Sequence, residues 1–302
     1  MTHIIILLFS IQIIAANYFE ELHLAANTSS DLAEVSETSV RSSFIEADKL
    51  YKKRGVDISY AKKAIKIYQS TLGPVSNQNA MKYVQLARMQ FYVGQFMQEE
   101  TAGSNRLTYF QSSYENASKA AKLFNQDFRE FPSLEHTQAI IYADAIYVYT
   151  MGLSQWAKLK GTFVILKKWP EIRDINQSLI DNAYGHIDYH GPYRVIGLAH
   201  NEMPPIAGGN PQIARKYLKI AFENTLTDRG FSAHMYNNIA YASRFLKDGK
   251  REEACEIVNK SRLMFKRDFE KVSPDRVPES LAEKKTILDI WLKNKCFQFE
   301  GN

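Results

Sequence analysis

The chain has 302 residues, 45% hydrophobic and 24% charged, a balance that is typical of a folded protein and excludes extensive disorder. Its net charge of +5 comes from 38 basic and 33 acidic residues spread along the whole sequence. Because no sustained basic stripe is present, we do not expect a nucleic-acid-binding surface. The 17 Tyr and 17 Phe, with few Gly and Pro, favour long helices packed through aromatic side chains.

Residues 1–16 have the pattern of a signal peptide. An apolar run over 4–14, broken only by Ser10 and Gln12, is too short to span a membrane but has the length of a signal-peptide core. Ala15 and Ala16 supply small residues for cleavage after either position. We therefore expect a periplasmic protein. No cysteine lies near this boundary, which argues against a lipoprotein. A buried N-terminal helix is the alternative.

A Ser- and Thr-rich leader over 17–43, which we expect to be mobile, precedes a single all-helical domain over 44–302. No alternating run rich in β-branched residues predicts a strand. Apolar periodicity and turn residues predict helices over 44–54, 58–72, 81–100, 107–128, 134–160, 171–183, 193–201, 211–225, 232–247, 250–266 and 279–293.

Three of these helices carry a small, a large and a small residue at positions i, i+4 and i+7. The sets are Ala64, Tyr68 and Thr71, then Ala214, Leu218 and Ala221, then Ala254, Val258 and Ser261. This pattern is typical of tetratricopeptide-like hairpins, which bury their apolar faces by stacking on one another. The intervals between the sets are unequal, so we predict a degenerate array of stacked antiparallel hairpins around a central cavity or channel.

The stretch over 184–225 defines two helices and the turn between them. Pro192 suits the first turn of a helix, and Met203-Pro204-Pro205 ends it. Gly208-Gly209 allows positive φ, and Asn210 caps the next helix, which begins at Pro211.

With the helix over 147–166, this stretch resembles the T-component (TatT) proteins of bacterial TRAP transporters, which are periplasmic, all-helical and related to tetratricopeptide repeats. The resemblance covers about 143–263, and Val148 and Gly152 depart from the family's pattern. It implies a homotrimer with a channel in each protomer, and a periplasmic solute-binding protein as partner.

Six residues are candidate ligand contacts in such a channel. Arg194 has a planar fork that suits a carboxylate, although a structural ion pair with a neighbouring helix is the alternative. Tyr hydroxyls need water or a polar partner, so several Tyr on one helix indicate a partly wet wall. The resemblance implies that the helix over 232–247 also faces the channel. The candidates are Tyr147, Trp156, Tyr193, Arg194, Asn237 and Tyr241.

No enzyme motif is present, and we expect neither catalysis nor a cofactor. The nearest candidate for a metal site is the group His186, Asp188, His190, His200 and Glu202. Most of this group falls on a loop or a helix end, so we predict no metal. His190 is instead expected to cap the helix after it or to hold the turn. A metal-dependent enzyme that uses this group is one rival hypothesis.

Only two cysteines are present, Cys255 and Cys296, and in an exported protein they could pair. Cys255 could equally be a small buried hydrophobe. We therefore leave the disulfide open.

Together these features predict a non-enzymatic binding and docking component that presents or relays a small apolar or carboxylated ligand. The other rival hypothesis is a helical-repeat scaffold for protein assembly, with a filled core and no small-molecule site.

Overall fold

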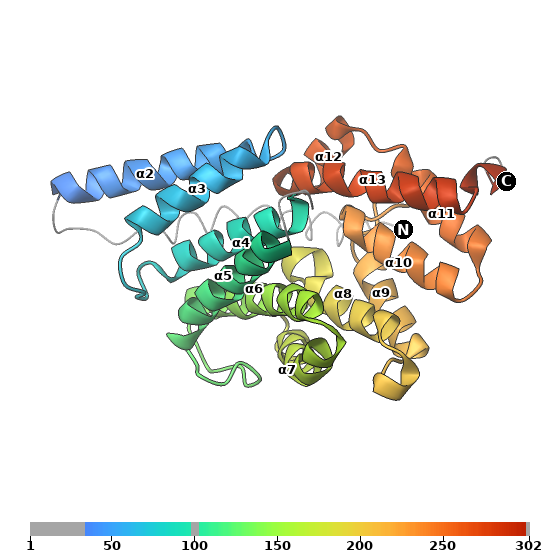
Figure 1. Cartoon of the computed structure of the whole chain (residues 1–302), viewed down its shortest axis with the longest axis horizontal. Coiled ribbons are helices and arrows are strands. Elements are labelled where there is room, and N and C mark those ends of the chain that lie inside the picture. The colour runs from blue at the N-terminus through green and yellow to red at the C-terminus, as the bar shows by residue number, and fades with distance from the viewer. Residues whose placement is uncertain (1–33, 98–102, 300–302) are drawn as a thin grey trace, which may run out of the picture.

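The computed structural model describes residues 34–97 and 103–299, which form an all-helical protein (Figure 1). The only extended pairing in the described residues is an isolated bridge between Leu226 and Ser232. The predicted all-α fold class is therefore confirmed. The helices are α2 (Glu34–Lys52), α3 (Ile58–Thr71), α4 (Ala80–Phe96), α5 (Gly103–Lys122), α6 (His136–Lys160), α7 (Thr162–Asp181), α8 (Ile187–Glu202), α9 (Pro211–Glu223), α10 (Met235–Lys247), α11 (Arg251–Arg262), α12 (Lys266–Val272) and α13 (Val277–Lys293).

Three short 3-10 turns lie between or after these helices: η2 (Pro205–Ala207), η3 (Pro274–Arg276) and η4 (Cys296–Phe299). The predicted signal peptide, and the predicted leader up to residue 33, lie outside the described residues. The last ten residues of that leader belong to α2, which begins earlier than the predicted start at residue 44.

Helix starts with a capping side chain were predicted accurately. The carboxylate of Asp57 accepts a hydrogen bond from the backbone N–H of Ser59 at 2.7 Å, where α3 begins. The side chain of Asn210 accepts from the N–H groups of Gln212 and Ile213, each at 3.0 Å, at the start of α9. These bonds satisfy N–H groups that have no partner within their own helix, which fixes where each helix begins.

Two predicted elements were wrong. Helix α7 begins at Thr162, not at residue 171, and it continues through Pro170. Pro170 is exposed, and tertiary packing of the apolar residues before it outweighs the helix-breaking tendency of proline. The predicted helix over 250–266 ends at Arg262, and a separate short helix, α12, follows it.

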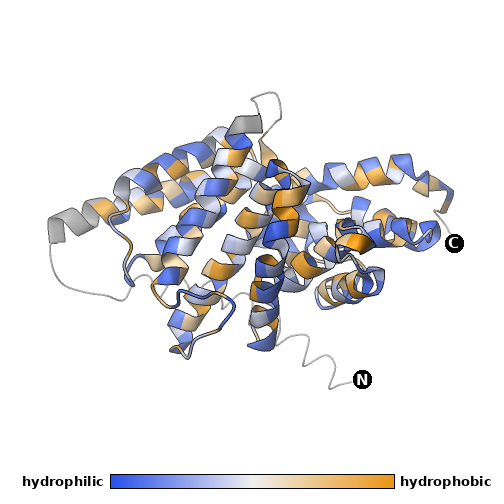
Figure 2. Ribbon diagram, turned by 60° about the horizontal axis from the view of Figure 1, so that its bottom comes forward, coloured by the Kyte–Doolittle hydropathy of each residue, from blue (hydrophilic) through white to orange (hydrophobic). Residues whose placement is uncertain are grey.

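The helices form an array in which successive helices pack side by side (Figure 1). The largest contacts join α4 to α5, α5 to α6, α8 to α9, α6 to α7 and α2 to α3. Hydrophobic and hydrophilic residues alternate around most helices in Figure 2, so each helix has one face to bury. The small and large residues picked out from the sequence lie on these buried faces, except Thr71, which is half-buried.

Glycines allow the closest helix contacts within α4, α5 and α6. A Cβ added to Gly152 would lie 2.9 Å from the backbone nitrogen of Tyr114, and one added to Gly94 would lie 3.0 Å from the ring of Phe110. The departure noted at Gly152 is therefore a packing feature, because only glycine leaves room for α5 at that point.

Three clusters of buried apolar residues make up the core. One cluster centres on α2–α4, a second on α4–α8, and a third on α9–α13 and the chain end that follows. The clusters do not fuse into one solid interior, and the space where they meet is the candidate functional site.

Candidate functional site

A cavity of about 2180 Å³ lies where the three core clusters meet. Helices α4, α6, α7 and α8 contribute to its lining, together with the segment over 223–236 and the segment from α12 to α13. Cavities of this kind, with mostly apolar walls and a few polar groups, are the usual sites for small molecules. The apolar wall residues include Phe91, Phe96, Met151, Ile165, Leu166 and Leu198.

One end of the cavity is polar and is organised around the buried carboxylate of Asp188. Arg194 Nη2 donates to Asp188 Oδ2 at 2.7 Å, and Arg276 Nη1 donates to Oδ1 at 3.2 Å. The hydroxyl of Tyr147 also donates to Oδ2 at 2.7 Å. Burial raises the pKa of Asp188, but Arg276 and Arg194 outweigh burial and hold that pKa well below its usual value. Asp188 is therefore ionised and fully paired.

Asp188 begins a left-handed turn at the start of α8. Asp188, Tyr189 and His190 have φ values of 48°, 54° and 62°. Non-glycine residues in this region each cost on the order of 1–3 kcal/mol and persist only where their surroundings hold them. Here Asn237 Nδ2 donates to the carbonyl of Tyr189 at 3.1 Å, while Arg194 holds Asp188.

Gly191 follows this turn and is required by the approach of α6. A Cβ at Gly191 would lie 2.1 Å from the hydroxyl oxygen of Tyr147. The Gly191-Pro192 pair noted in the sequence therefore lets the strained turn meet α6, and regular helical geometry resumes directly after His190. The Nδ1 atom of His190 is buried without a hydrogen-bond partner, so a capping role through that atom is not seen.

The segment over 274–283 attaches the C-terminal helices to the start of the chain. Arg54, just after α2, donates through Nε and Nη2 to the carboxylate of Glu279 at 3.0 and 2.9 Å. Tyr189 donates to Asp275 at 2.7 Å. A bidentate, buried arginine–carboxylate pair fixes both partners in orientation. These bonds hold α13 against the polar end of the cavity.

Two buried side chains at the polar end have strongly shifted pKa values. Burial raises the pKa of Glu283 to about 7, although Arg276 opposes the shift. Burial, with Arg194 and Arg276 nearby, lowers the pKa of His234 well below its usual value. His234 is therefore neutral, and Glu283 changes its charge near neutral pH.

Of the six predicted ligand contacts, Tyr147 and Arg194 line the cavity. The guanidinium N–H groups of Arg194 are already hydrogen-bonded within the protein. Besides Asp188, Arg194 donates to Asn237 Oδ1 at 2.8 Å and to the Tyr147 hydroxyl at 3.1 Å. Of the two roles considered for Arg194, the structural ion pair is the one formed. Its partner, however, lies at the start of the same helix and not on a neighbouring one.

The other four predicted contacts are not among the residues that line the cavity. Trp156 meets the ring of Tyr114 edge-on at 5.6 Å, and Tyr193 packs beside Tyr217 at 5.9 Å. Tyr241 packs on Phe222 at 5.1 Å within the C-terminal core. Asn237 lies behind the cavity wall, where its side chain accepts a hydrogen bond from Arg194 and donates one to the left-handed turn at Tyr189.

The residues of the candidate metal group do not converge. His200 contacts the carbonyl of Gly208 at 3.1 Å, and Glu202 pairs with Lys158 at 2.8 Å near the rim of the cavity. Asp188 is paired with arginines instead. Within the described residues, no group of three His, Cys, Asp or Glu side chains is arranged to hold a metal ion.

Sequence reasoning missed three residues at the polar end: His234, Arg276 and Glu283. They come from two separate segments, His234 from the start of α10 and the other two from the stretch over 274–283, and nothing in the local sequence around them marks a site. The nearest signal is the Ser273-Pro274-Asp275 turn, which breaks the helical pattern where η3 forms. Their proximity depends on how α10 and α13 pack, which one sequence does not reveal.

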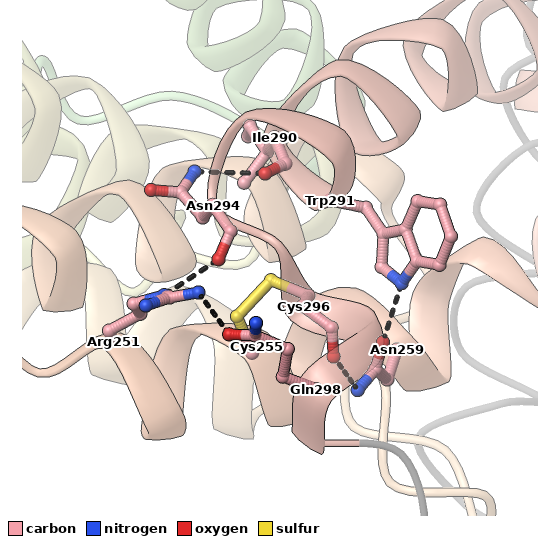
Figure 3. The surroundings of a disulfide bond; sticks show 8 residues. All are labelled: Arg251, Cys255, Asn259, Ile290, Trp291, Asn294, Cys296 and Gln298. Carbon is pink, nitrogen blue, oxygen red and sulfur yellow. Dashed lines mark hydrogen bonds between the residues drawn. A yellow bond between two sulfur atoms is a disulfide. The ribbon is translucent and has the colours of Figure 1, made fainter.

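The two cysteines form a disulfide between α11 and η4 (Figure 3), which answers the question left open by the sequence. The Cα atoms of Cys255 and Cys296 are 5.0 Å apart. Trp291 donates to the side chain of Asn259 at 2.9 Å, and Asn259 donates to the carbonyl of Cys296 at 3.3 Å. Together these contacts tie the end of α13 to α11.

No family model matches the chain, and no curated protein matches it significantly. None of the helices that the structure describes combines the length and the hydropathy that a membrane span requires.

Proposed function

We propose that the protein is a non-enzymatic binding component that holds a small amphipathic molecule in the cavity between its helices. The observation that carries the proposal is the cavity itself, about 2180 Å³, with many apolar side chains in its walls and a buried polar cluster around Asp188. The rival scaffold hypothesis requires a filled core, and a cavity of this size argues against it.

We further propose that the array is a degenerate tetratricopeptide-like one, similar to the TatT proteins. In this proposal the protein is exported to the periplasm, forms a homotrimer and presents its ligand to a soluble solute-binding protein. The disulfide supports export, because such bonds form and persist in oxidising compartments. The support for the family is the sequence pattern over 143–263 together with the all-helical array.

Ligand binding is tested by titrating the protein with 1-aminoanthracene, an uncharged fluorescent probe. We expect saturable uptake by the natural protein and at least a fivefold weaker affinity for Met151→Trp, because Met151 lines the cavity and the larger side chain narrows it there. Leu159→Trp is the matched control. It places the same side chain on the same helix, at a residue that is 45% exposed and outside the cavity lining.

Equal affinities for the two tryptophan variants, or no saturable uptake by the natural protein, would contradict the proposal. Native mass spectrometry of the secreted protein tests the remaining parts. It reports the number of subunits and the mass of any small molecule that co-purifies, and a bare monomer would contradict both the trimer and the ligand.

A further inference from the structure

Three side chains at the polar end have hydrogen-bonding atoms without partners. Both ring nitrogens of His234, Nε of Arg276 and Oε2 of Glu283 are buried and make no hydrogen bond. All three residues line the cavity, and His234 and Glu283 are only 1% and 9% exposed. A buried polar atom without a partner costs about 1–3 kcal/mol, so it usually indicates a partner that the protein alone does not supply.

The three side chains belong to one cluster. Arg276 Nη2 lies 3.8 Å from Glu283 Oε1, and Arg276 Nη1 donates to Asp188. The ring of His234 lies 5.5 Å from the ring of Tyr189, the residue that follows Asp188. The charges of Arg276 and Asp188 also act on the ring of His234, so the three side chains lie in the same region of the polar end.

The unpaired atoms include both donors and acceptors. Arg276 Nε carries a hydrogen and donates, and the neutral ring of His234 provides one donor and one acceptor. Glu283 Oε2 accepts when the carboxyl is ionised and can donate when it is protonated, and both forms are present near pH 7. A carboxylate head group only accepts hydrogen bonds, and an ammonium group only donates them, so each would leave part of this set unsatisfied. A primary amide both donates and accepts, so it suits the set with Glu283 in either form.

The charges at this end also disfavour an anionic head group. The four arginines of the lining that lie here, Arg54, Arg88, Arg194 and Arg276, each pair with a carboxylate of the protein. The lining supplies five acidic side chains in return: Asp144, Asp188, Asp275, Glu279 and Glu283. Arg276 Nε could still donate to a ligand carboxylate, but all four guanidinium groups already lie beside a carboxylate of the protein, so a further buried negative charge would be poorly compensated.

We propose that the ligand has an apolar chain and an uncharged head group, such as a primary amide, that both donates and accepts hydrogen bonds. His234, Arg276 and Glu283 hold this head group, and the apolar walls hold the chain. The proposal rests on the proposed binding function and narrows it, because it excludes the carboxylated ligands that the sequence left open.

Isothermal titration of the full chain with octanamide, octanoate and octylammonium at pH 7 tests the proposal. The three probes share one chain length and differ only in the head group. We expect octanamide to bind at least tenfold more tightly than either ion. Octanoate or octylammonium binding as tightly as octanamide would overturn the proposal.

Two variants locate the head group. His234→Phe keeps a ring but removes both nitrogens, and we expect it to weaken octanamide about fivefold while leaving octanoate unchanged. Glu283→Met, which keeps the length of the side chain but removes both oxygens, provides the same test if the first variant fails to fold. His200→Phe is the matched control, since His200 lies outside the cavity lining. An equal loss for octanamide and octanoate in the His234 and Glu283 variants would overturn the proposed head-group contact.

The outcomes separate this inference from the proposed function. If all three probes bind equally, the cavity binds alkyl chains and the head-group site is absent, so only the inference fails. If none of them binds and 1-aminoanthracene also fails to bind, the binding function itself fails.

Discussion

The layer formed by α4, α5 and α6 and the polar end of the cavity are stabilised in opposite ways. In the layer, small residues such as Gly94 and Gly152 let neighbouring helices approach, and most contacts are apolar, with a few buried hydrogen bonds such as that of Asn116 to Gln90. At the polar end, buried ion pairs hold a strained turn, and several polar atoms have no partner. The layer is stabilised mainly by packing, whereas the polar end has a strained backbone, which reduces stability and is typical of binding sites.

The largest effect is expected from breaking the ion pairs at the polar end. Asp188→Ala leaves Arg194 and Arg276 buried without their main partner, and removing one member of a buried pair costs about 3–5 kcal/mol. We expect the free energy of unfolding, measured by urea denaturation, to fall by this amount. Asp174→Ala is the control, because its pair with Arg173 is exposed and worth less than about 1 kcal/mol. Similar losses in the two variants would show that Asp188 is not central to the fold.

An intermediate effect is expected in the packed layer. Gly152→Ala introduces a Cβ 2.9 Å from the backbone of Tyr114, so α5 must move away from α6. Overpacking of this kind costs about 1–3 kcal/mol, reduced by the better helix propensity of alanine. Thermal unfolding measures the loss, and the affinity for 1-aminoanthracene should stay unchanged because Gly152 does not line the cavity. An unchanged stability would mean that the two helices are less closely packed than described.

The most specific effect is a pH dependence of stability. The pKa of Glu283 is about 7 in the folded protein, whereas its ordinary value, expected in the unfolded chain, is 4.5, so between these pH values the folded state keeps a proton that the unfolded state loses. Stability therefore decreases as pH rises through this window, by up to roughly 1.4 kcal/mol per pH unit, and levels off above pH 7. The charged groups that face Glu283 are Arg276, Glu279, Arg194 and Asp188.

Glu283→Gln removes this proton exchange. The variant should match the natural protein near pH 4.5 and become the more stable of the two as the pH approaches 7, as measured by urea denaturation at each pH. Glu256→Gln, at an exposed pair with Lys260, is the control and should follow the natural protein at every pH. Parallel curves for Glu283→Gln and the natural protein would contradict the raised pKa.

The helices could largely be predicted from the sequence, and the polar end could not. Apolar periodicity locates a helix such as α3 because the signal lies within the helix itself, as does the capping side chain of Asp57. The left-handed turn at 188–190 is different, since Tyr147 and Asn237 hold it from elements about forty residues away on either side. The same holds for Arg276 and Glu283, which reach the cavity only because α13 returns to the start of the chain.

The sequence analysis also predicted two of the residues that line the cavity, Tyr147 and Arg194. It chose them for their side-chain chemistry, without knowing where they lie in the fold. An aromatic helix and an arginine beside a helix start were recognised as chemistry that suits a ligand. In the structure, these two side chains form a hydrogen bond with each other. Residue type could therefore indicate the region of the site, but it could not indicate which polar atoms there lack a hydrogen-bond partner.

The bridge between Cys255 and Cys296 has a consequence for how the cavity is assembled. It closes a loop across 41 residues, and a crosslink of this span contributes about 2–4 kcal/mol by restricting the unfolded chain. The loop contains all of α12 and α13, so the disulfide ties this wall of the cavity to α11, in addition to the bonds from Arg54 and Tyr189. Protein made under reducing conditions would keep those bonds but lose the crosslink, so its C-terminal wall would open more readily.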